Sequence, residues 1–231
     1  MSMLFDEKKG EEGSSELPEM AQRILSVAME LFARKGYSAT SVREIVQAAK
    51  VTNPMLYYYF ESKEGLFYRL LNLLFDEMDR RVLAVAELNK EEPFDVQLRE
   101  IVKLHMEVVQ ESPVALRFIY AVLFGPKESH PKFNPEVRRK LSTGVVLEIF
   151  QDAMNRGEFV PREDTNLEFL VMQFFGMLNQ YLLLLFMHDT HQIEPPLNLF
   201  GEGCCEAGRD MVEHLLSFYL GGAGRICRPD I

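Results

Sequence analysis

Three consecutive tyrosines lie at the centre of the segment VTNPMLYYYFESKEGLF, which runs from Val51 to Phe67 and also carries Asn53 and Lys63. Their hydroxyl, amide and ammonium groups are of the kinds that contact bases and phosphates when a helix enters a DNA groove. The chain shows no Ser/His/Asp triad, glycine-rich phosphate loop or carboxylate pair at a recognisable spacing. The sequence therefore predicts a binding protein without a cofactor, and not an enzyme.

A short helix must present these groups. Thr52 or Asn53 can cap its start, and Pro54 suits its first turn because a missing N–H costs nothing there. Leu56 and Phe60 are separated by four residues, so they share one face and are predicted to pin the helix to a core. The outward-facing residues are then Asn53, Met55 and Tyr58, with Tyr57 and Tyr59 on the flanks.

The preceding helix is predicted from Ser41 and Glu44, which have the spacing of a capping box. The connection to the next helix, residues 50–52, is only three residues long. This order is the helix-turn-helix arrangement, whose second helix enters the major groove. In front of it, apolar residues recur at helical spacing up to Gly36, so three helices over residues 19–60 are predicted to enclose a small core. The apolar positions are Ile24, Ala28, Leu31, Phe32, Val42, Ile45, Val46 and Ala49.

These spacings resemble the amino-terminal signature of the tetracycline-repressor (TetR) family. The resemblance covers about a fifth of the chain. It implies an all-α protein with an N-terminal three-helix DNA-binding domain and a C-terminal helical domain for ligand binding and dimerisation. It also implies a dimeric, ligand-responsive transcriptional regulator, most often a repressor. The matching residues are Ala28, Phe32, Gly36, Tyr37, Thr40, Ile45, Ala49, Val51, Leu56, Tyr57, Phe60, Lys63 and Leu66.

Three positions depart from the usual family pattern. Lys50 stands where the family usually has glycine in the turn, Val46 where alanine is common, and Pro54 where glycine is more frequent. These departures concern the turn geometry and the DNA sequence preference. Lys63 matches a position that contacts phosphate in the family, and we expect both Lys63 and Tyr58 to be exposed.

The outward side chains have alternative roles. Tyr58 is expected to contact DNA. Tyr57 and Tyr59 are expected to pack their rings and turn their hydroxyls outward. Arg43 is a candidate for a guanine edge or a phosphate, with a solvated surface charge as the alternative, and Asn53 either contacts a base edge or only caps its helix. The predicted DNA-contacting residues are Ser41, Arg43, Thr52, Asn53, Pro54, Met55, Tyr57, Tyr58, Tyr59 and Lys63.

The formal net charge is −10, and it is unevenly distributed along the chain. Residues 19–64 hold six basic and five acidic side chains, whereas residues 65–231 hold 17 basic and 25 acidic ones. The predicted DNA-binding segment is thus the part that is not acidic, although it is hardly basic. We expect modest phosphate attraction, with specificity carried by the motif.

Three regions are predicted. Residues 1–17 are polar and acidic and form a disordered tail. Residues 18–64 form the helix-turn-helix domain, and residues 65–225 form the helical ligand-binding and dimerisation domain. A long helix from Ser62 to about Leu88 joins the two domains. A hydrophobic content of 47% and the lack of alternating strand patterns favour an all-α chain.

Two helices, residues 166–187 and 204–220, carry more apolar surface than one subunit needs to bury. Pairing them with their copies in a second subunit would cover that surface. A two-fold dimer also fits a palindromic DNA operator. Polar residues interrupt the segment 167–187, which argues against a membrane span.

The helical body is expected to enclose a small apolar or amphipathic ligand that releases the protein from DNA. Small-molecule pockets combine an apolar lining with a few polar groups. Each candidate has ordinary core packing as its alternative. The candidates are His105, Phe118, Tyr120, Phe124, Phe150, Met154, Gln173, Phe174, Met177 and Gln180.

The cysteines and a histidine-containing segment are candidates for redox or metal chemistry, but simpler roles are favoured for both. Cys204 and Cys205 are adjacent and form no disulfide framework, so reduced thiols and a cytoplasmic protein are expected. Oxidation sensing is a less favoured alternative for this pair. His188 and His191, with Asp189 and Glu194, fit no strong zinc pattern, so a solvated loop is favoured over a metal site.

Three classes of function remain. The first is a ligand-responsive regulator that binds a palindromic operator as a homodimer. The second is a protein-interaction regulator whose helix-turn-helix no longer binds specific DNA, an idea supported only by Lys50 and the weak basicity. The third is an enzyme or ligand-storage module, which leaves the tyrosine-rich segment unexplained.

Overall fold

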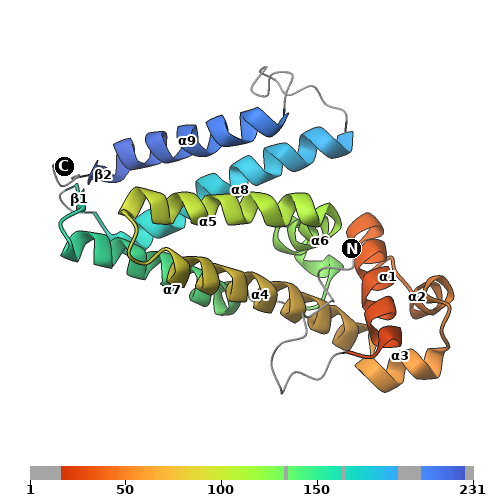
Figure 1. Ribbon diagram of the computed structural model, residues 1–231. Helices are drawn as coiled ribbons and strands as arrows, with labels where there is room; N and C mark the ends of the chain where they lie inside the picture. Colours follow the sequence, from red (N-terminus) through yellow and green to blue (C-terminus); the bar gives the residue numbers. More distant parts are fainter. Residues whose placement is uncertain (1–16, 133–134, 163–164, 192–203, 227–231) are drawn as a thin grey trace. The chain divides into compact units, whose positions relative to one another are not determined.

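The computed structural model describes residues 17–132, 135–162, 165–191 and 204–226. These residues are almost entirely helical (Figure 1), which confirms the predicted all-α class. The helices are α1 (Glu19–Lys35), α2 (Val42–Ala49), α3 (Asn53–Phe60), α4 (Lys63–Leu88), α5 (Phe94–Glu111), α6 (Pro113–Phe124), the short 3-10 helix η2 (Lys127–Ser129), α7 (Pro135–Asn155), α8 (Leu167–His191) and α9 (Cys204–Ala223). The predicted tail falls outside the described residues except for Leu17. None of the described helices is long and apolar enough to cross a membrane.

The chain folds into two compact units. The first comprises residues 1–78 and 109–138, and the second residues 79–108 and 139–231. The first unit therefore contains α1–α3, most of α4, and α6. The division differs from the domain boundary predicted at residue 64, because α4 and α6 pack their apolar faces on the three-helix head.

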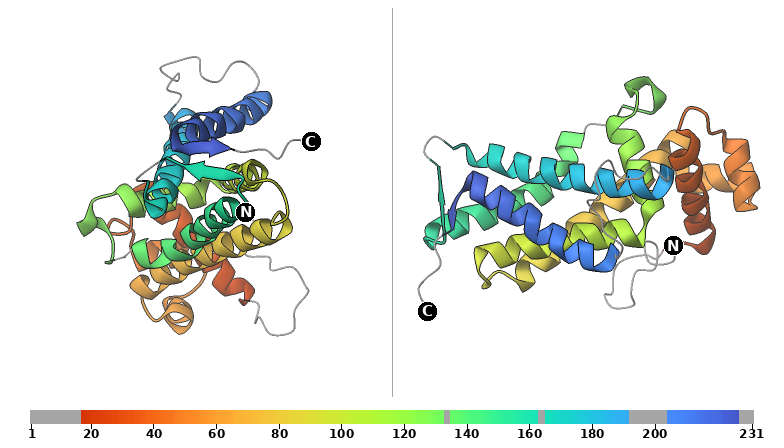
Figure 2. Two further views of the ribbon diagram at one scale, coloured as in Figure 1. Left: turned by 90° about the vertical axis from the view of Figure 1, so that its left-hand side faces the viewer. Right: turned by 90° about the horizontal axis from the view of Figure 1, so that it is seen from above.

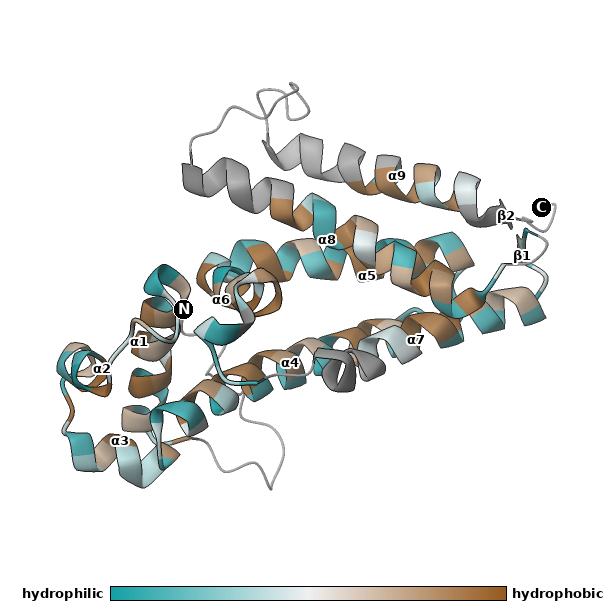
Figure 3. Cartoon of the chain, turned by 180° about the vertical axis from the view of Figure 1, so that it is seen from behind, coloured by the Kyte–Doolittle hydropathy of each residue, from teal (hydrophilic) through white to brown (hydrophobic). Residues whose placement is uncertain are grey.

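The core of the first unit is a continuous apolar cluster. Periodic apolar residues of α1, α2 and α3 meet those of α4 and α6, and banding along α4 shows its amphipathic pattern (Figure 3). Rings of Phe32, Phe67 and Phe118 lie within 5.6–6.1 Å of one another. This core holds α3 through its buried side and leaves the opposite side free.

Local sequence signals set the helix starts in this unit. Ser41 and Glu44 form the predicted capping box. The Ser62 hydroxyl accepts a hydrogen bond from the Gly65 N–H at 2.9 Å, which caps α4 as expected. Each cap satisfies backbone donors that would otherwise lack partners.

The second unit is a helical bundle in which α8 and α9 run side by side (Figure 2). An aromatic cluster lies at its centre: the rings of Phe94 and Phe150 are 4.9 Å apart, and those of Phe174 and Tyr219 are 5.5 Å apart. The Tyr219 hydroxyl donates to the Leu170 carbonyl oxygen at 2.6 Å, so α8 and α9 are also joined by a polar contact.

A small sheet closes the second unit and was not predicted. Strands β1 (Phe159–Pro161) and β2 (Gly224–Ile226) pair antiparallel, with Phe159 opposite Ile226. Three residues per strand are too few to show alternation, so periodicity could not reveal the pair. Phe159 is 1% exposed and packs on the aromatic cluster, which anchors β1.

Candidate nucleic-acid interface

The turn between α2 and α3 sets the angle of the second helix. Lys50 adopts a left-handed conformation, with φ 53° and ψ 44°, and its N–H points back to the last turn of α2. The Val51 N–H donates to the Val46 carbonyl oxygen at 3.0 Å. Glycine adopts this conformation without steric cost, so the usual glycine of the turn and Lys50 fulfil the same backbone requirement.

The α3 helix has one buried and one exposed side. Leu56 is fully buried and Phe60 is 6% exposed, which confirms that these two residues pin the helix. Tyr58 is 82% exposed and Tyr57 48% exposed. The Tyr59 ring is half-buried and meets the Tyr58 ring edge-on at 5.1 Å. The outward position predicted for Tyr58 is therefore confirmed.

The first turn of α3 carries a free amide. Thr52 occupies the cap position, but no side-chain capping bond forms there. Asn53 and Pro54 are exposed, and Asn53 makes no side-chain hydrogen bond to any described residue. Of its two predicted roles, capping is not the one seen. Met55 was predicted to face outward but is half-buried, because it lies one helical turn before the half-buried Tyr59 and shares that flank of α3.

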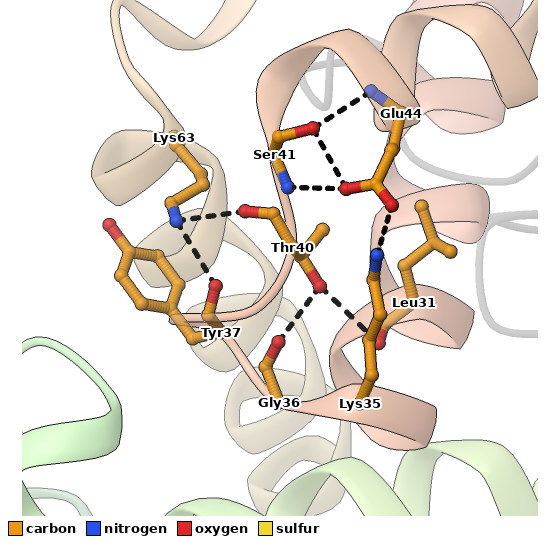
Figure 4. A network of polar contacts seen from close by, with 8 residues as sticks. All are labelled: Leu31, Lys35, Gly36, Tyr37, Thr40, Ser41, Glu44 and Lys63. Atoms are coloured by element: carbon orange, nitrogen blue, oxygen red, sulfur yellow. Dashed lines mark hydrogen bonds and ion pairs between the residues drawn. The ribbon is translucent and has the colours of Figure 1, made fainter.

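Polar contacts hold the start of α2 (Figure 4). The Ser41 N–H donates to the Glu44 carboxylate at 2.8 Å, and the Glu44 N–H donates to the Ser41 hydroxyl at 3.2 Å. Lys35, in the last turn of α1, forms an ion pair with the same carboxylate. Lys35 first, and then Ser41, lower the pKa of Glu44 to about 2. The Ser41 side chain is thus engaged within the protein.

Lys63 is placed differently from the prediction. It is half-buried, and its ammonium donates to the main-chain carbonyl oxygens of Tyr37 at 3.0 Å and Thr40 at 2.9 Å (Figure 4). Burial lowers the pKa of this ammonium. The exposed position that we predicted is wrong, because these carbonyl groups converge only when α1 and α4 pack together. In this structure Lys63 secures the loop between α1 and α2.

A second anchor of the same loop comes from residues 127–132 and was not predicted from the sequence. The Ser38 hydroxyl donates to the Ser129 carbonyl oxygen at 2.7 Å. The Tyr68 hydroxyl donates to the Lys132 carbonyl oxygen at 3.0 Å, and the His130 ring stacks on Phe67. These partners are 64 and 91 residues apart in sequence, so no local signal could have predicted them.

The first unit contains three of the ligand-binding candidates. Phe118 is 1% exposed and belongs to the apolar core beside Phe32 and Phe67. Tyr120 stacks on Phe124 at 5.4 Å, and Phe124 itself is 66% exposed. Phe118 thus packs in the core of the first unit. Core packing was the alternative to ligand binding that the sequence left open for this residue.

The candidates of the second unit fall into three groups. Phe150 and Phe174 are fully buried within the aromatic cluster, and Met177 is half-buried. Gln173, Gln180 and Met154 are exposed, which differs from the enclosed position expected of a pocket wall. The remaining candidate is His105.

His105 is a neutral polar group inside the second unit. Its Nδ1 lies 2.7 Å from the Ile101 carbonyl oxygen, and its ring is 5.8 Å from Phe175, a residue absent from our candidates. Burial lowers the pKa of His105 to about 4. Because Nδ1 must carry a proton to donate to the carbonyl group, the neutral ring has Nε2 as a hydrogen-bond acceptor.

Both α8 and α9 carry large apolar side chains that are exposed. Phe169 is 59% exposed, Met172 64% and Phe218 71%. Gln173 and Gly176 are also exposed on α8. Leu216, which lies in the segment 204–220 predicted for dimerisation, is 3% exposed and packs inside the unit.

Several candidate side chains are not described by the structure. His188, Asp189 and His191 belong to α8 and Cys204 and Cys205 to α9, but nothing is described of their side chains, and Glu194 lies outside the described residues. Among the side chains that the structure does describe, no group of three His, Cys, Asp or Glu residues could hold a metal ion.

These features define a helix-turn-helix protein with an exposed second helix. Residues 24–70 match the family described as bacterial regulatory proteins, tetR family. The amino-terminal part of this chain therefore contains a domain of the tetR family.

Two relatives and one solved structure illustrate the similarity. An uncharacterized HTH-type transcriptional regulator, YuxN, of Bacillus subtilis (strain 168) is 39% identical over 69 residues, which is 30% of this chain and 24% of the relative. The probable acrEF/envCD operon repressor of Escherichia coli (strain K12) is 24% identical over 190 residues, 76% of this chain and 82% of the relative. The transcriptional regulator FadR of Bacillus subtilis, solved in complex with stearoyl-CoA, has a TM-score of 0.61 and 18% identity, and the match covers 87% of this chain and 98% of that chain.

Most of the matches to curated relatives cover only part of those proteins. Four curated relatives are matched over only 24% to 47% of their own length. The likeness to FadR shows a shared fold.

Proposed function

We propose that this protein is a transcriptional repressor that binds a palindromic operator as a homodimer and is released by a small amphipathic ligand. The exposed side of α3 carries the proposal. Asn53, Pro54, Tyr57 and Tyr58 project from a helix whose opposite side is locked into an apolar core. A rigid helix with free polar and aromatic side chains is suited to a DNA major groove.

The proposed dimer rests on exposed apolar side chains of α8 and α9. Phe169, Met172 and Phe218 are large apolar side chains with more than half of their surface exposed. Large apolar side chains exposed in this way favour burial against a partner. We commit to a second copy of this chain as that partner, because a two-fold dimer places two α3 helices on the two halves of a palindrome.

The proposed ligand site lies around His105. Its neutral imidazole and the neighbouring Phe175 ring provide one hydrogen-bonding group beside an apolar surface. The FadR structure of the same fold holds stearoyl-CoA, a molecule with an acyl chain and a polar head. This supports an amphipathic ligand. The name of the Escherichia coli relative supports repression as the direction of regulation.

The weaker alternative, a regulator that has lost DNA binding, keeps only one of its two arguments, the weak basicity. The other argument was Lys50 in the turn. Lys50 adopts the left-handed backbone that the tight connection requires, so α2 and α3 keep their arrangement.

A binding titration tests the proposal. The full-length protein would be titrated against fluorescent duplex DNA from the region upstream of its own gene, and then challenged with long-chain acyl compounds. We expect saturable binding that competitor DNA does not abolish, and release by an acyl compound. Tyr58→Ala should weaken binding without lowering the melting temperature, whereas Leu88→Ala, at a residue also 82% exposed but on α4, should leave binding unchanged. Equal binding of every duplex would contradict specific recognition.

A further inference from the structure

The recognition helix α3 contains no cationic side chain. Its sequence, NPMLYYYF, has neither arginine nor lysine. The commonest specific contact to guanine is an arginine or lysine that donates to O6 and N7 in the major groove. Within residues 41–62 the basic residues are Arg43, on α2, and Lys50, in the turn. Contacts of this kind can therefore come from those two positions but not from α3.

The α3 helix instead offers an amide beside apolar surface. Asn53 is exposed, and its carboxamide has no hydrogen-bond partner among the described residues. A carboxamide can donate to N7 of adenine and accept from its N6 amino group at the same time. Pro54 and the rings of Tyr57 and Tyr58 are exposed next to it. Such apolar groups suit the methyl group of thymine, which projects into the same groove.

We infer that the base pairs under α3 are A·T pairs, with an adenine bound by Asn53 and thymine methyl groups packed against Pro54 and the tyrosine rings. The inference rests on the proposed function and names the DNA sequence class that this site selects. A G·C pair under Asn53 would present O6 in place of the amino group of adenine, so the amide oxygen would face another acceptor.

Few charged groups near α3 are available for phosphates, so base contacts are expected to supply a larger share of the binding affinity. Lys35 is paired with Glu44, and Lys63 donates to two main-chain carbonyl groups, so both ammonium groups have partners within the protein. Glu61, directly after α3, is exposed and anionic. Few cations remain for phosphates, and phosphate contacts carry the sequence-independent part of the affinity. Discrimination between sequences depends on the base contacts, to which α3 contributes through Asn53, Pro54 and the tyrosines.

In vitro selection is the first test. The full-length protein would select binding sites from a random duplex pool, in parallel with Asn53→Ala and with Gln110→Ala, which removes an exposed amide from α5. We expect a palindrome with A·T pairs at its Asn53-dependent positions. Asn53→Ala should lose roughly 5- to 150-fold of the discrimination there, the range of one bidentate contact. Gln110→Ala should select the wild-type palindrome.

Base analogues test the contacts on the selected operator. Replacing the adenine by 7-deazaadenine removes N7 only, and replacing thymine by uracil removes the methyl group only. We expect 7-deazaadenine to weaken wild-type binding several-fold and to leave Asn53→Ala binding unchanged. Uracil should weaken both proteins equally, because it acts on contacts of Pro54 and the tyrosines.

The outcomes separate this inference from the proposed function. A pool without any enriched sequence would contradict sequence-specific binding itself. An enriched palindrome with G·C pairs at the Asn53-dependent positions would overturn the inference alone. An unchanged palindrome for Asn53→Ala, or an equal effect of 7-deazaadenine on both proteins, would also overturn it.

Discussion

The ammonium of Lys63 lies 4.0 Å from the centre of the Tyr37 ring, while it donates a hydrogen bond to the carbonyl oxygen of the same residue. Tyr37 in turn packs edge-on against Phe67 at 5.1 Å. One side chain at the start of α4 thus holds the end of α1 and the entry to α2. Together with the Ser38–Ser129 hydrogen bond, this contact holds the loop that leads into the helix-turn-helix, since that loop has no regular structure of its own.

Lys63→Met should lower stability. The variant keeps the aliphatic stem but leaves two carbonyl oxygens without their charged donor, which is expected to cost about 1–3 kcal/mol of unfolding free energy. Arg43→Ala, at an exposed cation of α2, should change stability by less than about 0.5 kcal/mol. Denaturant titration would measure both. A Lys63→Met protein of wild-type stability, whose DNA binding has lost about one unit of salt dependence, would restore the phosphate-contact role.

Lys50→Gly should stabilise the protein. A left-handed conformation is unfavourable for a residue with a Cβ atom, and glycine removes that cost, so a gain of up to about 1 kcal/mol is expected. The matched control is Gln47→Gly, in the regular part of α2, which should destabilise by about 1 kcal/mol. Chemical denaturation of both variants gives the comparison. A loss of stability in Lys50→Gly as large as that in Gln47→Gly would show that the turn does not require this conformation.

The lowered pKa of Glu44 predicts that the stability of the fold decreases in acid. Its pKa falls from 4.5 to about 2 in the folded protein because of Lys35 and Ser41. A depressed carboxyl pKa stabilises the fold above the unfolded pKa, and this contribution disappears as the pH falls from about 4.5 to about 2. Glu44→Gln should therefore show a shallower loss of stability across that window than the wild type.

The control for this measurement is Glu61→Gln, at an exposed carboxylate just after α3. Thermal melts of the wild type and both variants, recorded between pH 5 and pH 2, give the comparison. If stability falls equally steeply with pH in the wild type and in Glu44→Gln, then Lys35 and Ser41 do not lower the pKa of Glu44.

Phe218→Glu should produce monomers. Each copy of a two-fold interface loses one apolar side chain worth about 1.5–3 kcal/mol, so the dimer should weaken by roughly 100-fold or more. Leu88→Glu, which changes an 82% exposed leucine of α4, should leave the oligomeric state unchanged. Sedimentation velocity across a concentration series would report it. Leu216 is unsuitable for this test, because its burial means that a charge there would disrupt the unit itself.

Interactions between residues close in sequence were determined by the sequence alone. The capping box of Ser41 and Glu44, the cap at Ser62 and the buried pair Leu56 and Phe60 each span three or four residues. Helix geometry brings such neighbours together whatever the rest of the chain does. The exposure of Tyr58 follows from the same periodicity, so the candidate interface was predictable in its main features.

Only the tertiary structure decided the roles of Lys63, Phe118 and the Phe159–Pro161 strand. Lys63 meets carbonyl groups 23 and 26 residues away, and Phe118 joins the core of the DNA-binding head from α6. The strand pairs with Gly224–Ile226, a segment far from it in the sequence. A side chain of given polarity is compatible with several environments. Which environment it occupies depends on the distant segment that packs beside it. The packing that prevails is the one that buries the whole core. It depends on all segments together and cannot be deduced from any one of them.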